Sequence, residues 1–159
     1  MEKINHSKPK GSSSEMWLIF LVNPFLSLLF AIKNFNYPSA KNVLWAFTVF
    51  YGFTYVISRD EMDSSRYRDN FIELSHRDVT FEQFTNTMYD TESMSIDLLN
   101  PIIQYFLSRI TDDSRILFAV YGLIFGYFYS RNIWYLLDRL KGKIKPVIFP
   151  VIIAFALTS

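Results

Sequence analysis

The sequence predicts an all-α, polytopic integral membrane protein with about four transmembrane helices and short amphipathic helices in an extracytoplasmic loop. Half of the 159 residues are hydrophobic and 18% are aromatic, including sixteen Phe and ten Tyr. This content exceeds that of an ordinary soluble domain. A helix built from any of the apolar runs would have no polar face for water, so a soluble, Phe-rich bundle is the weaker alternative. The four runs are Met16–Ile32, Val43–Ile57, Ile116–Leu137 and Ile144–Leu157.

The N-terminal part predicts a polar tail followed by two spans. Residues 1–15 are polar, and residues 16–58 predict a pair of transmembrane helices. Each of the two apolar runs reaches the roughly 20 residues of a full span only by including polar flanks. Pro24 lies inside the first run, directly after Asn23. Because proline lacks a backbone donor, it predicts a kink in this helix.

Residues 59–115 form a polar loop with helix signals in it. The loop contains twelve acids, six Arg and no Lys. Thr80 followed by Gln83 resembles a capping box at a helix start. Asn100 followed by proline is typical of an N-cap and the first residue of a helix. We therefore expect two short helices in this loop.

The second of these helices carries an apolar stripe. The stripe predicts that the helix lies on the membrane surface or covers a cavity. Gln104 and Tyr105 are then expected on its polar face. The stripe consists of Ile103, Phe106, Leu107 and Ile110.

Residues 116–159 predict two further membrane segments. Gly122 and Gly126 have the spacing that permits a close helix contact, although tolerance of both glycines by chance is an equal alternative. Arg131 interrupts the run, which predicts that the span proper ends at Tyr129. The chain ends at Ser159, directly after the fourth apolar run. We therefore expect a truncated last segment and a chain that is the front part of a longer protein.

Lysine and arginine in short loops predict the orientation. Arg139 and the three lysines of residues 141–145 place the loop between the third and fourth runs in the cytoplasm, and Lys33 and Lys41 agree. Residues 59–115 are then extracytoplasmic, as their acidity allows. This arrangement places the N-terminus outside, against the preference of its own three lysines. The four positive charges of one loop outweigh the short tail.

Several classes of site are excluded. The chain has no Cys, so disulfides and thiolate metal sites cannot form. The acid-rich loop is unlike the basic stripe of a nucleic-acid-binding protein. The sequence contains no Gly-rich phosphate loop, nucleophile elbow or zinc motif. His6 and His76 have no second ligand at metal spacing. No metal, cofactor or nucleic-acid partner is expected.

A dense run of charges follows the second apolar run and is the candidate site. Arginine has a planar fork of donors that suits a pyrophosphate. Asp63 could orient a sugar hydroxyl or accept its proton, and Tyr67 could stack on a sugar. Arg68 is a weaker candidate because it falls off the shared face. The alternative is a salt-bridged helix end anchored at the membrane interface. If residues 59–71 continue the second span as a helix, one face presents Arg59, Asp63, Arg66, Tyr67 and Asn70.

Three segments resemble proteins of the EpsG family, relatives of the Wzy O-antigen and capsular polysaccharide polymerases. They are SRDEMDSSRYRDNF at residues 58–71, LLNPIIQYFLSRI at residues 98–110 and ILFAVYGLIFGYFYSRNIW at residues 116–134. The resemblance covers about residues 16–157 and relies on hydropathy more than on invariant motifs. Ser65 stands where the family often has an aromatic residue, so a stacking role is lost there. Family members have ten or more spans, which agrees with an N-terminal part.

The resemblance implies a polymerase in the bacterial cytoplasmic membrane that joins oligosaccharide repeat units carried on undecaprenyl pyrophosphate. It implies Asp63 as the catalytic residue and Arg59, Arg66, Tyr67 and Arg68 as substrate-binding residues. No metal or nucleotide sugar is required. The expected partners are the undecaprenyl-pyrophosphate-linked oligosaccharide, the lipid bilayer, and a flippase or chain-length regulator.

Two other functions compete with this one. The first is a non-catalytic scaffold or assembly partner in envelope polysaccharide export, whose outer loop docks another subunit. The second is a small transporter. A transporter is expected to have ionisable residues inside its spans, and the predicted spans have none deep within them. The transporter therefore ranks last.

Overall fold

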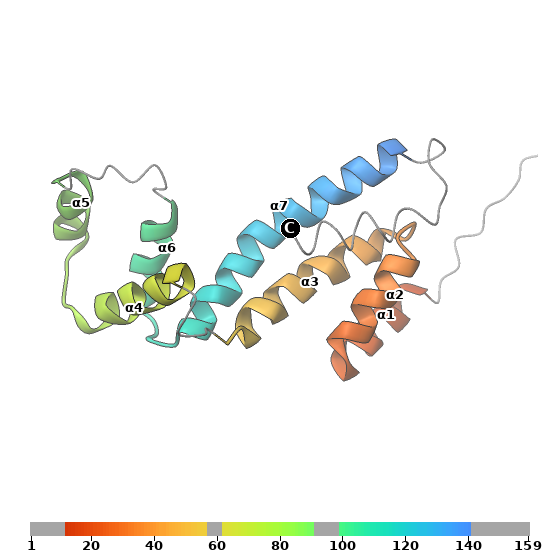
Figure 1. Ribbon diagram of the computed structural model, residues 1–159, viewed down its shortest axis with the longest axis horizontal. Coiled ribbons are helices and arrows are strands. Elements are labelled where there is room, and N and C mark those ends of the chain that lie inside the picture. Colours follow the sequence, from red (N-terminus) through yellow and green to blue (C-terminus); the bar gives the residue numbers. More distant parts are fainter. Residues whose placement is uncertain (1–11, 57–61, 91–98, 141–159) are drawn as a thin grey trace, which may run out of the picture. The chain divides into compact units, whose positions relative to one another are not determined.

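The computed structural model describes residues 12–56, 62–90 and 99–140, and these residues form helices without any strand (Figure 1). The all-α prediction is confirmed. The chain divides into two compact units, one formed by Met1–Phe50 with Gly122–Ser159 and the other by Tyr51–Tyr121. The helices are α1 (Ser12–Val22), α2 (Pro24–Lys33), α3 (Pro38–Thr54), α4 (Met62–His76), α5 (Phe81–Asp90), α6 (Leu99–Ser108) and α7 (Ser114–Leu140).

In the first unit, the predicted kink is a complete break. Asn23 has an extended backbone (φ −153°, ψ 102°), and its side chain accepts a hydrogen bond from the Leu26 N–H at 3.1 Å. Pro24 then occupies the first position of α2, where no backbone donor is required. The single kinked helix expected over Met16–Ile32 is therefore wrong. In its place, α1 and α2 fold back on each other, and Ser27 Oγ donates to the Met16 carbonyl at 2.8 Å (Figure 1).

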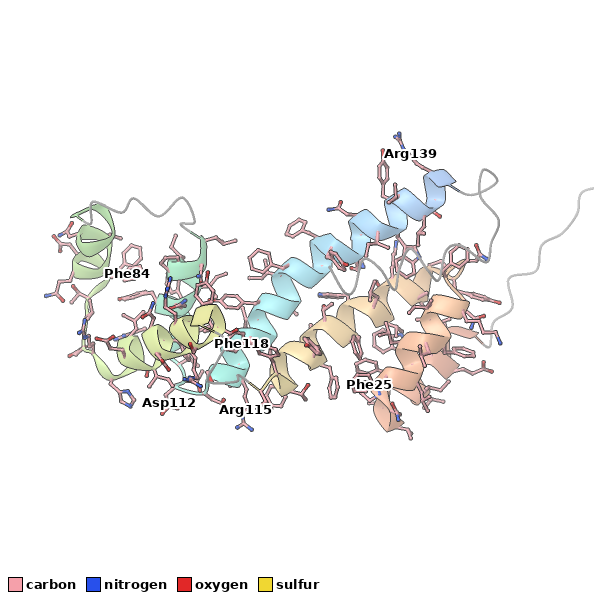
Figure 2. All side chains as sticks on the ribbon, viewed as in Figure 1. Phe25, Phe84, Asp112, Arg115, Phe118 and Arg139 are labelled. Atoms are coloured by element: carbon pink, nitrogen blue, oxygen red, sulfur yellow. The ribbon has the colours of Figure 1, made fainter. Side chains whose placement is uncertain are left out.

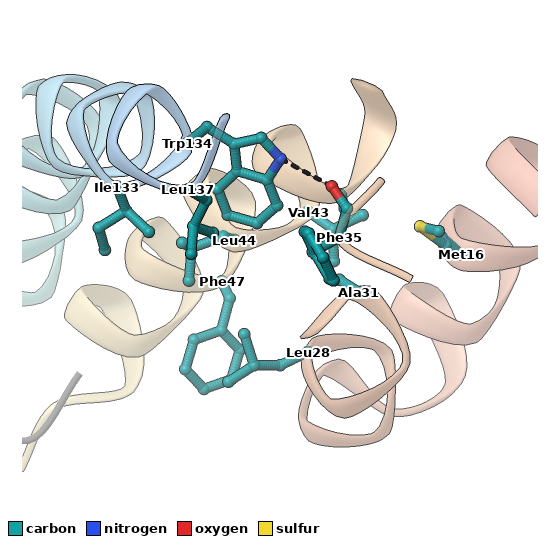
Figure 3. Packing of buried hydrophobic residues seen from close by; sticks show 11 residues of the cluster. Met16, Leu28, Ala31, Phe35, Val43, Leu44, Phe47, Ile133, Trp134 and Leu137 are labelled. Carbon is teal, nitrogen blue, oxygen red and sulfur yellow. Dashed lines mark hydrogen bonds between the residues drawn. The ribbon is translucent and has the colours of Figure 1, made fainter. Parts of the chain in front are cut away.

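The core of the first unit lies between α2, the N-terminal half of α3 and the C-terminal half of α7. Trp134 of α7 is buried, and its indole N–H donates to the Phe35 carbonyl at 3.0 Å (Figure 3). This bond satisfies a carbonyl just past the end of α2 and joins α7 to that turn. The buried apolar residues are Met16, Leu28, Ala31, Phe35, Ala40, Val43, Leu44, Phe47, Ile133, Trp134 and Leu137.

Glycines bring α3 and α7 into close contact within the first unit. A Cβ atom on Gly122 would lie 2.9 Å from the carbonyl carbon of Thr48, and one on Gly126 would lie 2.8 Å from Thr48 Cβ. Thr48 Oγ1 donates to the Gly122 carbonyl at 3.0 Å, and the Trp45 indole N–H donates to the Leu123 carbonyl at 2.8 Å. Of the two equal alternatives for the glycine spacing, the structure therefore favours the close helix contact.

Within the described residues, α7 is the helix long and apolar enough to cross a membrane, over Ser114–Arg139. The helix continues through Arg131, so the predicted end of the membrane span at Tyr129 is not an end of the helix and stays a prediction. α3 has 17 residues and ends at Thr54. The fourth apolar run, Ile144–Leu157, lies outside the described residues. The polytopic arrangement therefore stays a prediction.

In the second unit, α4 and α6 pack against each other, and Arg109 joins them. The Arg109 guanidinium donates to the carbonyls of Leu74 and Arg77, the latter at 3.0 Å. These carbonyls lie at the C-terminal end of α4, where helix carbonyls lack partners inside the helix. Phe71 of α4 is completely buried. Aromatic rings join α5 to α6, with Phe84 stacked on Tyr105 at 4.6 Å between centroids.

The capping box at the start of α5 is confirmed. The Thr80 N–H donates to Gln83 Oε1 at 3.0 Å, and the Gln83 N–H donates to Thr80 Oγ1 at 3.3 Å. Both bonds satisfy N–H groups that have no partner inside the helix.

Removing this cap should destabilise α5. We expect Thr80→Ala to lower the unfolding free energy of the second unit by about 0.5–2 kcal/mol, measured as a change in thermal or denaturant unfolding in detergent. Thr80→Ser keeps the hydroxyl and is the control. Equal losses for the two variants would show that the reciprocal hydrogen bonds do not hold this helix start.

Candidate functional site

The predicted site residues lie on and just before α4. The helix does not continue from α3, because α3 ends at Thr54 and residues 55–56 are not helical. The condition that residues 59–71 continue the second span as one helix is therefore not met. Arg59 lies outside the described residues. Asp63 lies in the first turn of α4, and its side chain is likewise outside the description.

One face of α4 presents Arg66, Tyr67 and Asn70 to solvent, and we call it the α4 face. Arg66 and Asn70 are one turn apart, and Asp63 precedes Tyr67 by one turn, so all four positions follow one side of the helix. Phe71 is buried and holds α4 against the rest of its unit. This anchoring leaves the α4 face open.

Arg68 is partly buried and is already occupied. Its Nε–H donates to Asp69 at 2.8 Å, and the side chains of Arg68 and Asp69 are 33% and 64% exposed. None of the ion pairs recorded among the described residues involves Arg66. Arg66 is therefore the better placed of the two arginines to receive an anionic ligand.

A second charged group lies at the start of α7, where Asp113 caps the helix. Asp113 Oδ1 accepts from the Arg115 N–H at 2.9 Å, and its carboxylate pairs with the Arg115 guanidinium at 2.7 Å. The hydrogen bonds from Arg115 lower the pKa of Asp113. The carboxylate therefore remains ionised at neutral pH. The side chains of Asp112 and Arg115 project outward here (Figure 2).

The packing of α6 reverses one prediction. Gln104 and Tyr105, expected on a polar outer face, are buried, whereas Phe106 is 57% and Ile110 is 82% exposed. Gln104 Nε2 donates to Asn100 Oδ1 at 2.9 Å and to the Tyr121 hydroxyl at 3.2 Å.

Asn100 is the second residue of α6, which begins at Leu99, so it is not the N-cap that the sequence predicts. Its side chain accepts a hydrogen bond from Gln104 instead. The one-turn spacing of Asn100 and Gln104, which suits an amide pair, was the sequence signal for this arrangement.

Arg131 is a functional candidate that the sequence reading passed over. The sequence predicts a span that ends at Tyr129, just before it, and the structure places it within α7 and within the segment Ser114–Arg139 that could cross a membrane. Its position in a continuous apolar helix is the signal that could have identified it. Among the described residues, no three His, Asp or Glu side chains gather as metal ligands.

In comparisons with known proteins, no family model matches this chain, and no curated protein or solved structure shows significant similarity to it.

Proposed function

We propose that this chain is a multi-pass protein of the bacterial cytoplasmic membrane that polymerises repeat units carried on undecaprenyl pyrophosphate, or is the N-terminal part of such a polymerase. The observation that carries the proposal is the α4 face, with Arg66, Tyr67 and Asn70 exposed along one side of a short helix. Arginine binds phosphate oxygens in pairs, and an aromatic ring can pack against a sugar. The resemblance to the EpsG family supplies the substrate class.

The placement in a membrane is supported by the distribution of side chains. Large apolar residues are exposed in both units, for example Phe25 in α2, Phe106 in α6 and Phe128 in α7 (Figure 2 labels Phe25). Small polar residues such as Ser27 and Ser130 are completely buried. Small residues between helices and apolar residues outside are typical of helices packed in lipid, whereas such an apolar surface on a soluble protein marks an interaction site.

The proposed reaction forms one bond and breaks one. The hydroxyl of an acceptor sugar attacks the anomeric carbon of the donor, and a new glycosidic C–O bond forms. The bond from that carbon to the pyrophosphate breaks, and undecaprenyl pyrophosphate leaves. Asp63 takes the hydroxyl proton, and Arg66 stabilises the leaving pyrophosphate. Tyr67, Arg59 and the weaker candidate Arg68 hold the sugar and phosphates in place. A flippase or chain-length regulator is the expected protein partner.

The test is the amount and length of polymer made by cells that carry variants of this chain. A charge-assisted contact contributes about 1.5–3 kcal/mol, and each 1.4 kcal/mol changes a rate about tenfold. We therefore expect Arg66→Ala to lower polymer yield by about ten- to a hundredfold at unchanged protein level. Arg66→Lys should restore part of the yield, because a point charge cannot reproduce the planar fork.

Arg77→Ala is the matched control, directly after the same helix. The Arg77 side chain is 66% exposed and pairs with Glu73 at 2.5 Å, and an exposed pair of this kind contributes little. Its removal should leave polymer yield unchanged. Normal chain lengths in both Arg66→Ala and Asp63→Ala would contradict the polymerase proposal.

The alternative is a non-catalytic scaffold in polysaccharide export. The exposed apolar side chains of Phe81 and Phe106, whose rings lie 6.0 Å apart, favour it, because they could dock another subunit. Under the scaffold alternative, Phe106→Asp would reduce polymer yield while the Arg66 and Asp63 variants would not.

A further inference from the structure

Arg131 is a charged residue inside the longest apolar helix of the described chain. It lies sixteen residues after Arg115 and eight before Arg139, between the apolar stretches of α7. A charge in such a position is costly in a membrane and is retained where it has a partner or a function. Arg131 is partly buried in the first unit.

The contacts of Arg131 are all with neutral groups. Its Nη2 donates to Asn42 Oδ1 of α3 at 2.7 Å, and its Nη1 donates to Ser130 Oγ at 3.2 Å. Its guanidinium carbon lies 4.6 Å from the centroid of the Tyr127 ring and 5.8 Å from that of Trp45. These groups position the guanidinium plane between two helices.

The neutral contacts leave the positive charge without an anion. None of the ion pairs recorded among the described residues involves Arg131. A guanidinium has five N–H donors, and the hydrogen bonds to Asn42 and Ser130 use two of them. The faces of Tyr127 and Trp45 attract a cation but do not neutralise it. The remaining donors suit the oxygens of a phosphate, which arginine binds in pairs.

The surroundings of Arg131 would suit a phosphate that is attached to a lipid. Leu123, Tyr127 and Phe128 of the same helix are exposed, and so are Tyr135 and Leu136 beyond Arg131. Tyr and Trp side chains are enriched at the level of the lipid headgroups. An acyl chain could lie along the apolar side chains while its phosphate reaches the guanidinium.

We propose that Arg131, oriented by Asn42 and flanked by Trp45 and Tyr127, binds the phosphate of a membrane lipid headgroup. This site belongs to the first unit and shares no residue with the α4 face, so it does not depend on the proposed polymerase activity. Arg131 is the binding residue, and Asn42 positions it.

The test is ligand binding to the purified full chain in a neutral detergent. Trp45, one of three Trp in the chain, lies beside the guanidinium, and its fluorescence reports binding. The probes are dioctanoyl phosphatidic acid, dioctanoyl glycerol and inorganic phosphate. We expect phosphatidic acid to bind at least about tenfold more tightly than dioctanoyl glycerol or inorganic phosphate, because only the first combines the charge with the acyl chains.

Arg131→Gln removes the charge but keeps a donor for Asn42, and we expect it to weaken phosphatidic acid binding by about tenfold or more. Asn42→Leu leaves the charge in place and should cause a several-fold loss. Arg139→Gln is the matched control, since Arg139 lies in the same helix over the Tyr135 ring at 4.7 Å. It should bind like the unaltered chain.

Two results would overturn the proposal. Undiminished phosphatidic acid binding by Arg131→Gln shows that Arg131 joins α3 to α7 without a ligand. Equal affinity for inorganic phosphate and phosphatidic acid shows that the anion comes from solution and not from lipid. If Arg131→Gln does not fold, as judged by its circular dichroism, Asn42→Leu decides, and unchanged binding by that variant counts against the site.

Discussion

Gly122→Leu should nearly abolish the folded form of this protein. The Cα of Gly122 faces the backbone of α3, and a Cβ there would lie 3.0 Å from the Cα of Val49 and within the contact distance of the Thr48 carbonyl. Backbone atoms cannot rotate away as a side chain does, so the two helices must separate. Overpacking costs about 1–3 kcal/mol and occasionally more.

Separation also breaks the hydrogen bonds that Thr48 and Trp45 donate to α7, each contributing about 0.5–1.5 kcal/mol. Together, these losses are a large share of the free energy of unfolding of a typical protein, which is about 5–15 kcal/mol. The measurement is the monodisperse fraction of detergent-extracted protein in size-exclusion chromatography. Phe128→Ala changes an exposed side chain of the same helix and is the control. Gly126→Ala should fall between them, because it meets mainly the Thr48 side chain.

The second large effect is expected from Phe71→Ala in the second unit. Phe71 is completely buried and is the largest side chain with that degree of burial among the described residues. Replacing a buried Phe by Ala removes its contacts and leaves a cavity, at a cost of about 3–5 kcal/mol. We expect the unfolding midpoint of this unit to fall markedly and the α4 face to lose its support.

Polymer yield and unfolding should be measured together, because Phe71→Ala acts through folding and Arg66→Ala does not. Glu73→Ala is the control, since the Glu73 side chain is 57% exposed and pairs only with Arg77 among the ion pairs recorded for the described residues. An unchanged midpoint in Phe71→Ala would mean that α4 is held by other contacts.

Local signals in the sequence predicted local structure well. The capping box at Thr80 depends on residues three positions apart, so its geometry follows from the helix start alone. The break at Asn23 was underestimated, because capping by the Asn side chain allows a second helix to start where proline alone would only bend the first.

Predictions that depend on distant residues failed or stayed open. The polarity of Gln104 predicted that it lies on the outward face of α6. It is buried instead, and its amide donates to the hydroxyl of Tyr121, which is distant in the sequence. Arg131 predicts the end of a membrane span because it interrupts an apolar run, but the helix itself continues past it. The Asn42 amide of α3 allows it to remain inside the helix. The roles of Arg66 and its neighbours depend on a ligand, which no pattern of spacing identifies.

If the chain crosses the membrane as the sequence predicts, the break between α1 and α2 changes the side on which the N-terminus is expected. Helices of 11 and 10 residues extend about 15–17 Å each, roughly half of the ~30 Å hydrocarbon layer. In a bilayer, a hairpin of this reach enters one leaflet and returns to the surface it left, so it adds no crossing. The three N-terminal lysines then lie on the same surface as Lys33 and Lys41. In that predicted topology, the N-terminal lysines no longer conflict with the positive-inside rule, and all eight lysines of the chain are expected in one aqueous compartment.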